Sequence, residues 1–337
     1  MSYVTTINTI LKPNKTRSPL VLDLFAGCGG LALGFEALGF ETLGFEMDSD
    51  CCATYSHNLS GDCINIKLTP EYSFPKAQVV IGGPPCQPFS VGGQQKGLND
   101  SRDGFPIFIS AVKQAEPDIF IFENVRGLLY RNKWYLDEVI QSLEKLGYII
   151  EYQLLNAVNH GVPQNRERVI VVGHKGKFHY PAKKSIQITA GEALGNLAHE
   201  FHENSKFLTP SMDLYVANYE KASKCINPRD LYLDRPSRTV TCRNLAGATG
   251  DMHRIRLPNG SRRRITIREA ARLQSFPDWF EFIGTETRIF TQIGNAVPPM
   301  LAYALANSTR DYLNSSIRLN AREIVYHRMP QQLQLPI

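Results

Sequence analysis

The stretch LVLDLFAGCGG at residues 20–30 decides the fold. A mostly apolar run of strand type leads directly into a turn with three glycines, and a helical pattern follows over residues 31–38. Glycines let the backbone pass close to a ligand, and the N-terminus of a helix offers N–H groups that have no partner. The stretch therefore predicts a strand, a ligand-binding turn and a helix in direct succession.

The spacing of this turn, F-x-G-x-G-G over residues 25–30, differs from the G-x-G-x-x-G of dinucleotide enzymes and lacks the Lys-Ser/Thr of a P-loop. S-adenosylmethionine carries no phosphate, so it suits such a turn. The next predicted strand ends at Glu46, where a carboxylate can accept hydrogen bonds from both ribose hydroxyls. Glu46 alone could equally be a surface acid or the ribose ligand of a nicotinamide cofactor. Asp62 could contact the adenine amino group or could simply be solvated.

Around this unit, short apolar runs alternate with amphipathic stretches from residue 19 to residue 172, which is typical of a mainly parallel sheet. The clearest helix has apolar residues at 136, 139, 140, 143 and 146 and ends at Gly147. We expect a doubly wound α/β sheet. Its predicted strands are residues 20–24, 41–45, 63–66, 79–81, 119–122, 148–155 and 168–172.

The alternation stops after His174. Residues 175–234 are polar and irregular, with weak helix patterns over 190–197, and arginines concentrate over residues 254–272. A helix predicted over about residues 296–312 restores regular structure. We expect a first domain over residues 1–173, a second, smaller and irregular domain over residues 174–287, and a C-terminal segment over residues 288–337 that returns to the first domain.

Composition narrows the class of protein. The 337 residues contain 37 Lys and Arg against 32 Asp and Glu, and this mild basic excess favours a polyanionic partner. No apolar run is long enough to span a membrane, and residues 1–15 lack the apolar core of a signal peptide, so we expect a cytoplasmic protein without a membrane partner. Seven cysteines without paired C-x-x-C spacing argue against a disulfide framework and against a metal site.

A second loop sets one cysteine apart from the other six. The predicted strand at residues 79–81 opens into GGPPCQPFS at residues 82–90, where three prolines and two glycines constrain the backbone around Cys86. An ordinary buried cysteine needs no such loop. The strand at residues 119–122 is followed by Glu123, and the carboxyl ends of adjacent parallel strands face one crevice. We therefore expect Cys86 and Glu123 to converge.

A thiol and a carboxyl in one crevice suit the chemistry of cytosine carbon 5. This carbon takes a methyl group only after a nucleophile adds to carbon 6 and places negative charge on C5. A thiolate can add and later leave, while a carboxyl at N3 stabilises the adduct and accepts from the exocyclic amino group. Because a free thiol has a pKa of about 8.5, its surroundings or a concerted proton transfer must assist Cys86.

In their order along the chain, these motifs resemble the DNA cytosine-5 methyltransferases, chiefly the compact bacterial enzymes of restriction-modification systems. The resemblance covers nearly the whole chain and implies the sheet fold of methyltransferases that depend on S-adenosylmethionine. It rests on DLFAGCGG (23–30), Glu46, GPPCQPFS (83–90), ENV (123–125), QNRER (164–168), RPSRTVT (235–241) and GNAVPP (294–299), with a weaker match at DSR (100–102).

The resemblance also implies roles for individual residues. Cys86 would be the nucleophile and Glu123 the acid at N3, while Arg166 and Arg168 would support the flipped base and the catalytic loop; a surface ion pair with Glu167 is the alternative for these arginines. S-adenosylmethionine would be the methyl donor and S-adenosylhomocysteine the product. The expected cofactor contacts are Phe25, Ala26, Gly27, Gly29, Gly30, Glu46, Met47, Asp62, Gly83, Pro85, Asn295, Ala296 and Val297.

The expected substrate is double-stranded DNA. In this family, residues 174–234 would hold the target-recognition region, and the arginines that follow would contact phosphates, with binding that weakens steeply as salt rises. Because carbon 6 of a stacked cytosine is shielded, the base must flip out, and Gln94 or Gln95 of a mobile loop could fill its place; a merely flexible loop is the alternative. The expected DNA contacts are Ser90, Gln94, Gln95, Arg238, Thr239, Arg243, Arg254, Arg256, Arg262 and Arg263.

Three other interpretations are compatible with the sequence. A related branch of the same fold methylates cytosine in tRNA, and a catalytically silent DNA-binding homologue would share the motifs. A nicotinamide oxidoreductase could use a similar glycine turn but would leave Cys86 and Glu123 without a purpose. We also expect a monomer, associated with the bacterial nucleoid through DNA, and a partner restriction endonuclease that acts on the same site.

Overall fold

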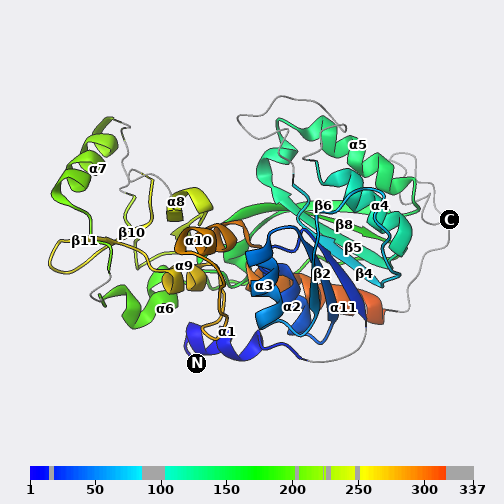
Figure 1. The fold of residues 1–337 in the computed structure, drawn as a ribbon, viewed down its shortest axis with the longest axis horizontal. Helices are drawn as coiled ribbons and strands as arrows, with labels where there is room; N and C mark the ends of the chain where they lie inside the picture. Colours follow the sequence, from blue (N-terminus) through cyan, green and yellow to red (C-terminus); the bar gives the residue numbers. More distant parts are fainter. Residues whose placement is uncertain are drawn as a thin grey trace.

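A seven-stranded sheet forms the centre of the protein, whose computed structural model describes residues 1–14, 19–85, 103–201, 205–222, 224, 229–246 and 251–315 (Figure 1). The strand order is β3-β2-β1-β4-β5-β8-β6, and β8 alone runs antiparallel to its two neighbours. The strands are β1 (Leu20–Leu24), β2 (Glu41–Glu46), β3 (Asp62–Asn65), β4 (Val79–Gly82), β5 (Ile119–Val125), β6 (Ile149–Asn156) and β8 (Glu167–His174). The predicted doubly wound, mainly parallel sheet is confirmed.

Helices cover both faces of this sheet because its central strands are apolar on both sides. Val80 and Phe120 belong to the core shared with α4 (Phe105–Ala115) and α5 (Lys133–Glu144). Their neighbours Ile81 and Ile121 point the other way, into the core shared with α2 and α11. The helices on this second face are α2 (Gly30–Glu36), α3 (Ser49–Asn58) and α11 (Pro299–Asn314).

The remaining elements lie to one side of the sheet, and Figure 1 shows them at the left. Buried residues of α6, α9 and the β10–β11 hairpin belong to the same hydrophobic cluster as one face of the sheet, so a continuous apolar core links the two parts. These elements are α6 (Ala190–Leu194), α7 (Pro210–Ala222), α8 (Cys242–Ala246), β10 (Arg254–Arg256), β11 (Arg262–Arg264), α9 (Ile267–Leu273) and α10 (Glu286–Asn295), with β7 (Gln164–Asn165) parallel to β9 (Ser237–Arg238).

Five of the described helices were not expected from the sequence: α1, α7, α8, α9 and α10. In α1 (Tyr3–Ile10), Tyr3 and Ile7 are buried one turn apart, and Ser2 caps the first turn through the backbone N–H of Thr5. Helix α7 lies in a stretch without a regular apolar pattern, whereas α10 buries Ile289, Phe290 and Ile293 on one face. The last helix, α11, begins at Pro299 instead of about residue 296, because Ala296 and Pro298 are extended. The described part of the chain also has three short 3-10 helices: η3 (Arg126–Leu129), η4 (Ala157–His160) and η5 (Gly195–Ala198).

No helix in the described part of the chain is both long and apolar enough to cross a bilayer.

Candidate active site

The turn between β1 and α2 has the close-packed geometry that its glycines predict. Phe25, Gly27 and Gly29 all have positive φ, and a Cβ on Gly29 would lie 2.9 Å from side-chain atoms of Tyr55. A Cβ on Gly30 would lie 2.4 Å from the carbonyl oxygen of Val297. The absence of a side chain at Gly30 therefore lets the segment before α11 approach the turn, although the two are more than 260 residues apart in the sequence.

Glu46 at the end of β2 faces this turn. Its Oε2 accepts the backbone N–H of Gly27 at 2.9 Å, and its Oε1 accepts that of Asp48 at 2.8 Å. Each oxygen keeps a second lone pair for a ligand hydroxyl. Met47 beside it has an exposed side chain, as an apolar surface for a flat ring requires. Nearby, burial raises the pKa of Asp23 well above its usual range, with the charge of Glu46 adding to the effect.

The sheet register corrects the expectation that Asp62 contacts adenine. Asp62 begins β3 and stands opposite Leu43, whereas Glu46 stands opposite Asn65. At about 3.3 Å per residue, Asp62 lies about 10 Å before the carboxyl end of the strand, where the turn and Glu46 are. Asn65 occupies that end instead, and its Nδ2 donates to the carbonyl of Glu46 at 3.0 Å, which leaves its side-chain oxygen for a ligand. Sequence reasoning missed Asn65 because nothing local fixes the register.

Glu123 and Arg168 form an ion pair at the ends of β5 and β8. Arg168 Nε lies 2.6 Å from Glu123 Oε1, and each side chain is 13% exposed. The other oxygen, Oε2, lies 3.8 Å from the place a Cβ would take on Gly83. Asn124 Nδ2 donates to the carbonyl of Pro84 at 3.0 Å and so ties the start of the proline loop to β5. Glu123 therefore presents one oxygen to Arg168 and the other toward the proline loop.

Several predicted site residues lie outside the described part of the chain. Pro85 is the last described residue before the gap at residues 86–102, and its carbonyl accepts the N–H of Gly104 at 3.0 Å, so both ends of the gap meet beside Glu123. The predicted residues that fall in this gap are Cys86, Ser90, Gln94 and Gln95. Their expected convergence with Glu123 stays a prediction.

Arg166 lies inside the protein and not on the surface. Its Nη1 donates to the carbonyl of Val240 at 2.8 Å, and its Nη2 donates to those of Gly294 at 3.2 Å and Ala296 at 3.0 Å. Burial lowers the pKa of this guanidinium to about 9, with the nearby charge of Arg168 adding to the effect. Arg166 therefore joins the β7–β8 junction to the segments at Val240 and Ala296, and its expected support of the flipped base and the catalytic loop stays a prediction.

Two buried glutamines complete this junction. Gln164 Oε1 accepts the N–H of Val240 at 2.7 Å, and its Nε2 donates to Gln274 Oε1 at 2.9 Å. Gln274 Nε2 in turn donates to the carbonyl of Ile293 at 2.6 Å. Gln164 is part of the QNRER motif, but nothing in the local sequence marks Gln274. The pair holds the segment at Asn295, Ala296 and Val297 next to the glycine turn, with Asn295 exposed and Val297 buried.

The predicted DNA-contacting arginines divide into two groups. Arg254 has a fully buried guanidinium paired with Glu220 and Asp230, and Arg263 is buried against Glu269 with two nitrogen–oxygen distances of 2.9 and 2.7 Å. These contacts correct the expectation that Arg254 and Arg263 reach phosphates, because carboxylates of the same chain already neutralise them.

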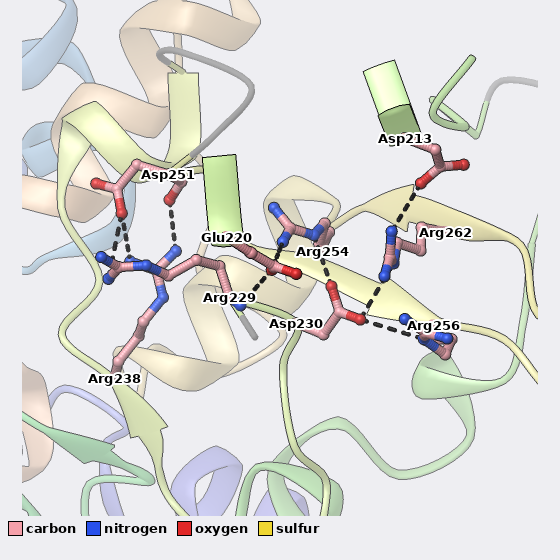
Figure 2. Close-up of polar contacts among 9 residues, drawn as sticks. All are labelled: Asp213, Glu220, Arg229, Asp230, Arg238, Asp251, Arg254, Arg256 and Arg262. Atoms are coloured by element: carbon pink, nitrogen blue, oxygen red, sulfur yellow. Dashed lines mark hydrogen bonds and ion pairs between the residues drawn. The ribbon is translucent and has the colours of Figure 1, made fainter. Parts of the chain in front are cut away.

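The other predicted DNA contacts are accessible to different degrees. Arg256 and Arg243 are exposed, and Arg262 is largely covered by its pairs with Asp213 and Asp230. Arg238 pairs with Asp251, as Figure 2 shows, and the hydroxyl of Thr239 donates to the carbonyl of Asn165 at 2.6 Å. No group of three or more potential metal-ligating side chains occurs among the described residues.

A sequence profile of C-5 cytosine-specific DNA methylases matches residues 20–310. The chain belongs to this family. It is 53% identical over 320 residues to the Type II methyltransferase M.AplI of Arthrospira platensis, covering 94% of this chain and 92% of the relative. It is 34% identical over 326 residues to the Type II methyltransferase M1.HphI of Haemophilus parahaemolyticus, covering 85% of each. The predicted family is confirmed, and the chain is a DNA cytosine-5 methyltransferase of the Type II restriction-modification kind.

Solved structures agree on the fold. A putative DNA modification methyltransferase encoded within an Escherichia coli prophage matches with a TM-score of 0.64 at 24% identity, covering 88% of this chain and 100% of that one. The Entamoeba histolytica methyltransferase EhMeth matches with a TM-score of 0.70 at 18% identity, covering 89% and 100%. The enzyme therefore has the fold of methyltransferases that depend on S-adenosylmethionine.

Proposed function

We propose that the enzyme methylates carbon 5 of a flipped-out cytosine in a specific double-stranded DNA sequence through a covalent bond between Cys86 and carbon 6. The observation that carries the proposal is the Glu123–Arg168 pair beside Gly83, at the start of the loop that contains Cys86. Glu123 Oε2 faces that loop and is available to the N3 and amino edge of a cytosine. Arg168 holds the other oxygen and so fixes the carboxyl in place.

In the proposed reaction the sulfur of Cys86 bonds to carbon 6, and the electron pair of the C5–C6 double bond becomes available at C5. Carbon 5 then takes the methyl group, loses its proton to a base, and the C6–sulfur bond breaks to restore the ring. When bound, S-adenosylmethionine supplies the methyl group on a sulfonium centre and leaves as S-adenosylhomocysteine. Glu123 would hold the proton at N3 while the negative charge develops on the ring.

The residues around the glycine turn fit S-adenosylmethionine. Glu46 has an unused lone pair on each oxygen for the ribose hydroxyls, and Asn65 has a free side-chain oxygen for the adenine amino group. The other predicted contacts come from four segments: the turn itself (Phe25, Ala26, Gly27, Gly29 and Gly30), the residue after β2 (Met47), the residues after β4 (Gly83 and Pro85), and the segment between α10 and α11 (Asn295, Ala296 and Val297). Arg166 would act on this site through the carbonyl of Ala296.

We assign residues 1–173 and 288–337 to catalysis and cofactor binding and residues 174–287 to DNA recognition. The Type II methyltransferase names of the relatives support a cognate restriction endonuclease for this enzyme too. The proposal further includes a monomeric enzyme that acts on nucleoid DNA in the bacterial cytoplasm. Closure of the DNA-bound loop, with Gln94 or Gln95 replacing the flipped base, belongs to the same proposal.

The test uses two variants and three nucleic acids. Cys86→Ser should abolish methyl transfer while calorimetric S-adenosylmethionine binding persists, and Cys51→Ser, at a half-buried position on α3, is the matched control that should stay active. Duplex DNA containing 5-fluorocytosine should trap an adduct on Cys86, since its C5 fluorine cannot leave as a proton does. An active Cys86→Ser enzyme, or a preference for tRNA over duplex DNA in a parallel assay, would refute the proposal.

A further inference from the structure

Three guanidinium groups converge on one carboxylate at one face of the β10–β11 hairpin (Figure 2). Arg254 and Arg256 are two residues apart on β10, so their side chains leave the same face, and Arg262 on β11 stands opposite Arg256. Asp230 accepts a hydrogen bond from each of the three. Its Oδ1 lies 2.6 Å from Arg254 Nε, and its Oδ2 lies 3.2 Å from Nε of both Arg256 and Arg262. Asp230 is therefore the common anchor of this face.

The charges on this face balance. Beside Asp230, Glu220 accepts from Arg254 at 2.8 Å and Asp213 accepts from Arg262 at 2.9 Å, so three carboxylates meet three guanidinium groups. Affinity for phosphates depends on net positive charge that releases counterions, and a balanced cluster supplies little of it. The neighbouring cluster differs, because Arg229 and Arg238 share the single carboxylate of Asp251. The Asp251 cluster has the excess of positive charge that phosphate binding requires, whereas the Asp230 face does not.

Only one of the three guanidinium groups on the Asp230 face keeps both terminal nitrogens available and is well exposed. Arg254 is fully buried, and Arg262 is 14% exposed and bonds through both Nε and Nη1. Arg256 is 53% exposed, and its hydrogen bond to Asp230 uses Nε, which leaves Nη1 and Nη2 for a ligand. A guanidinium held at Nε has a restricted plane, and its two terminal nitrogens match the O6 and N7 acceptors of guanine in the major groove.

We propose that Arg256 reads a guanine of the recognition sequence through its terminal nitrogens, and that Asp230 is the positioning residue that orients it. The inference rests on the proposed action on double-stranded DNA and deepens it, because it names a base contact and the residue that fixes it. A guanine contact differs from the phosphate contact that the sequence predicted for Arg256, because reading a base depends on the direction of the hydrogen bonds as well as on charge.

The experiment begins with the wild-type enzyme. Bisulfite sequencing of DNA treated with it gives the recognition sequence, and an absence of methylated cytosine would refute the proposed function and this inference with it. Duplexes are then made in which one guanine at a time is replaced by 7-deazaguanine, which lacks the N7 acceptor. The ratio kcat/KM is measured on each duplex for wild type, Arg256→Gln, Asp230→Asn and the control Arg310→Gln, an exposed arginine on α11.

One guanine position should depend on Arg256. We expect Arg256→Gln to lower kcat/KM on the unmodified site by about 5-fold to 150-fold, and to become insensitive to 7-deazaguanine at one position where wild type is sensitive. Asp230→Asn should lower the same sensitivity and raise KM with little change in kcat, a pattern that a general loss of folding does not produce. Arg310→Gln should behave as wild type at every position, and thermal melting confirms that each variant is folded.

The opposite outcome is equally defined. If Arg256→Gln weakens binding to all duplexes alike, lowers the salt slope of log K by about one, and keeps every 7-deazaguanine effect, Arg256 is a phosphate contact and the inference is wrong. If Arg256→Gln has the wild-type kcat/KM on the unmodified recognition sequence, the inference about Arg256 is also wrong, although the proposed methyl transfer still stands.

Discussion

Replacement of Arg263 by Met should destabilise the protein without removing a contact to DNA. Arg263 and Glu269 are both about 1% exposed, and Arg263 also donates to the carbonyls of Glu200, Arg264 and Leu197 at 3.1, 3.1 and 2.8 Å. The variant leaves a buried carboxylate without its partner, which costs about 3–5 kcal/mol. Since whole proteins are stable by about 5–15 kcal/mol, this loss is a large share of the total.

A double-mutant cycle tests this value. Arg263→Met combined with Glu269→Leu removes both charges, and we expect a free energy of unfolding closer to wild type than that of the single variant. Arg264→Met is the matched control: it removes a neighbouring, half-buried arginine whose guanidinium donates to the carbonyl of Leu245, and it should cost about 1 kcal/mol. Urea denaturation is followed by far-UV circular dichroism and by the fluorescence of Trp279, which follows this region in the chain.

The same variants decide between the structural role and a phosphate contact. The double variant, assayed at a temperature where it is folded, should bind DNA with the salt slope of wild type. A phosphate contact would instead lower that slope by about one. If Arg263→Met is as stable as wild type and has the lower slope, the assignment of Arg263 to the interior of the protein is refuted.

Two further predictions concern the cofactor turn and a buried histidine. Gly30→Ala should weaken S-adenosylmethionine binding by about 10-fold or more in calorimetry, because its Cβ would lie 2.4 Å from the carbonyl of Val297; Gly127→Ala, where a Cβ meets nothing within 4 Å, should bind as wild type does. Burial lowers the pKa of His253 to about 3. As the pH falls below about 6.5, the imidazole is therefore protonated in the unfolded chain before it is protonated in the folded protein. The stability that is present above about pH 6.5 is lost progressively toward about pH 3. His253→Phe should reduce the slope of unfolding free energy against pH between pH 6 and 5 by up to about 1.4 kcal/mol per unit, and an unchanged slope would contradict the assignment.

The fold and many of the candidate site residues could be predicted from the local sequence, because the patterns that indicate them extend over only a few residues. The alternation along residues 19–172 predicted all seven strands of the sheet, and Glu46 lies against the glycine turn with which it was predicted to form a cofactor end. The proline loop and Glu123 were expected on neighbouring strands, and β4 and β5 are indeed paired in register. Each of these inferences needed only a strand, its end and the residues that follow it.

What the sequence could not determine depends on contacts between distant segments. The choice between Asp62 and Asn65 follows from the register of β3 on β2, and a shift of three residues moves a side chain by about 10 Å. The arginines of residues 254–263 are alike in sequence, yet Glu220, Asp230 and Glu269 bury two of them and leave Arg256 accessible. Sequence determined which residue types were present; only the tertiary structure decided which charges were already paired, because ion pairs form between segments that chain folding brings together.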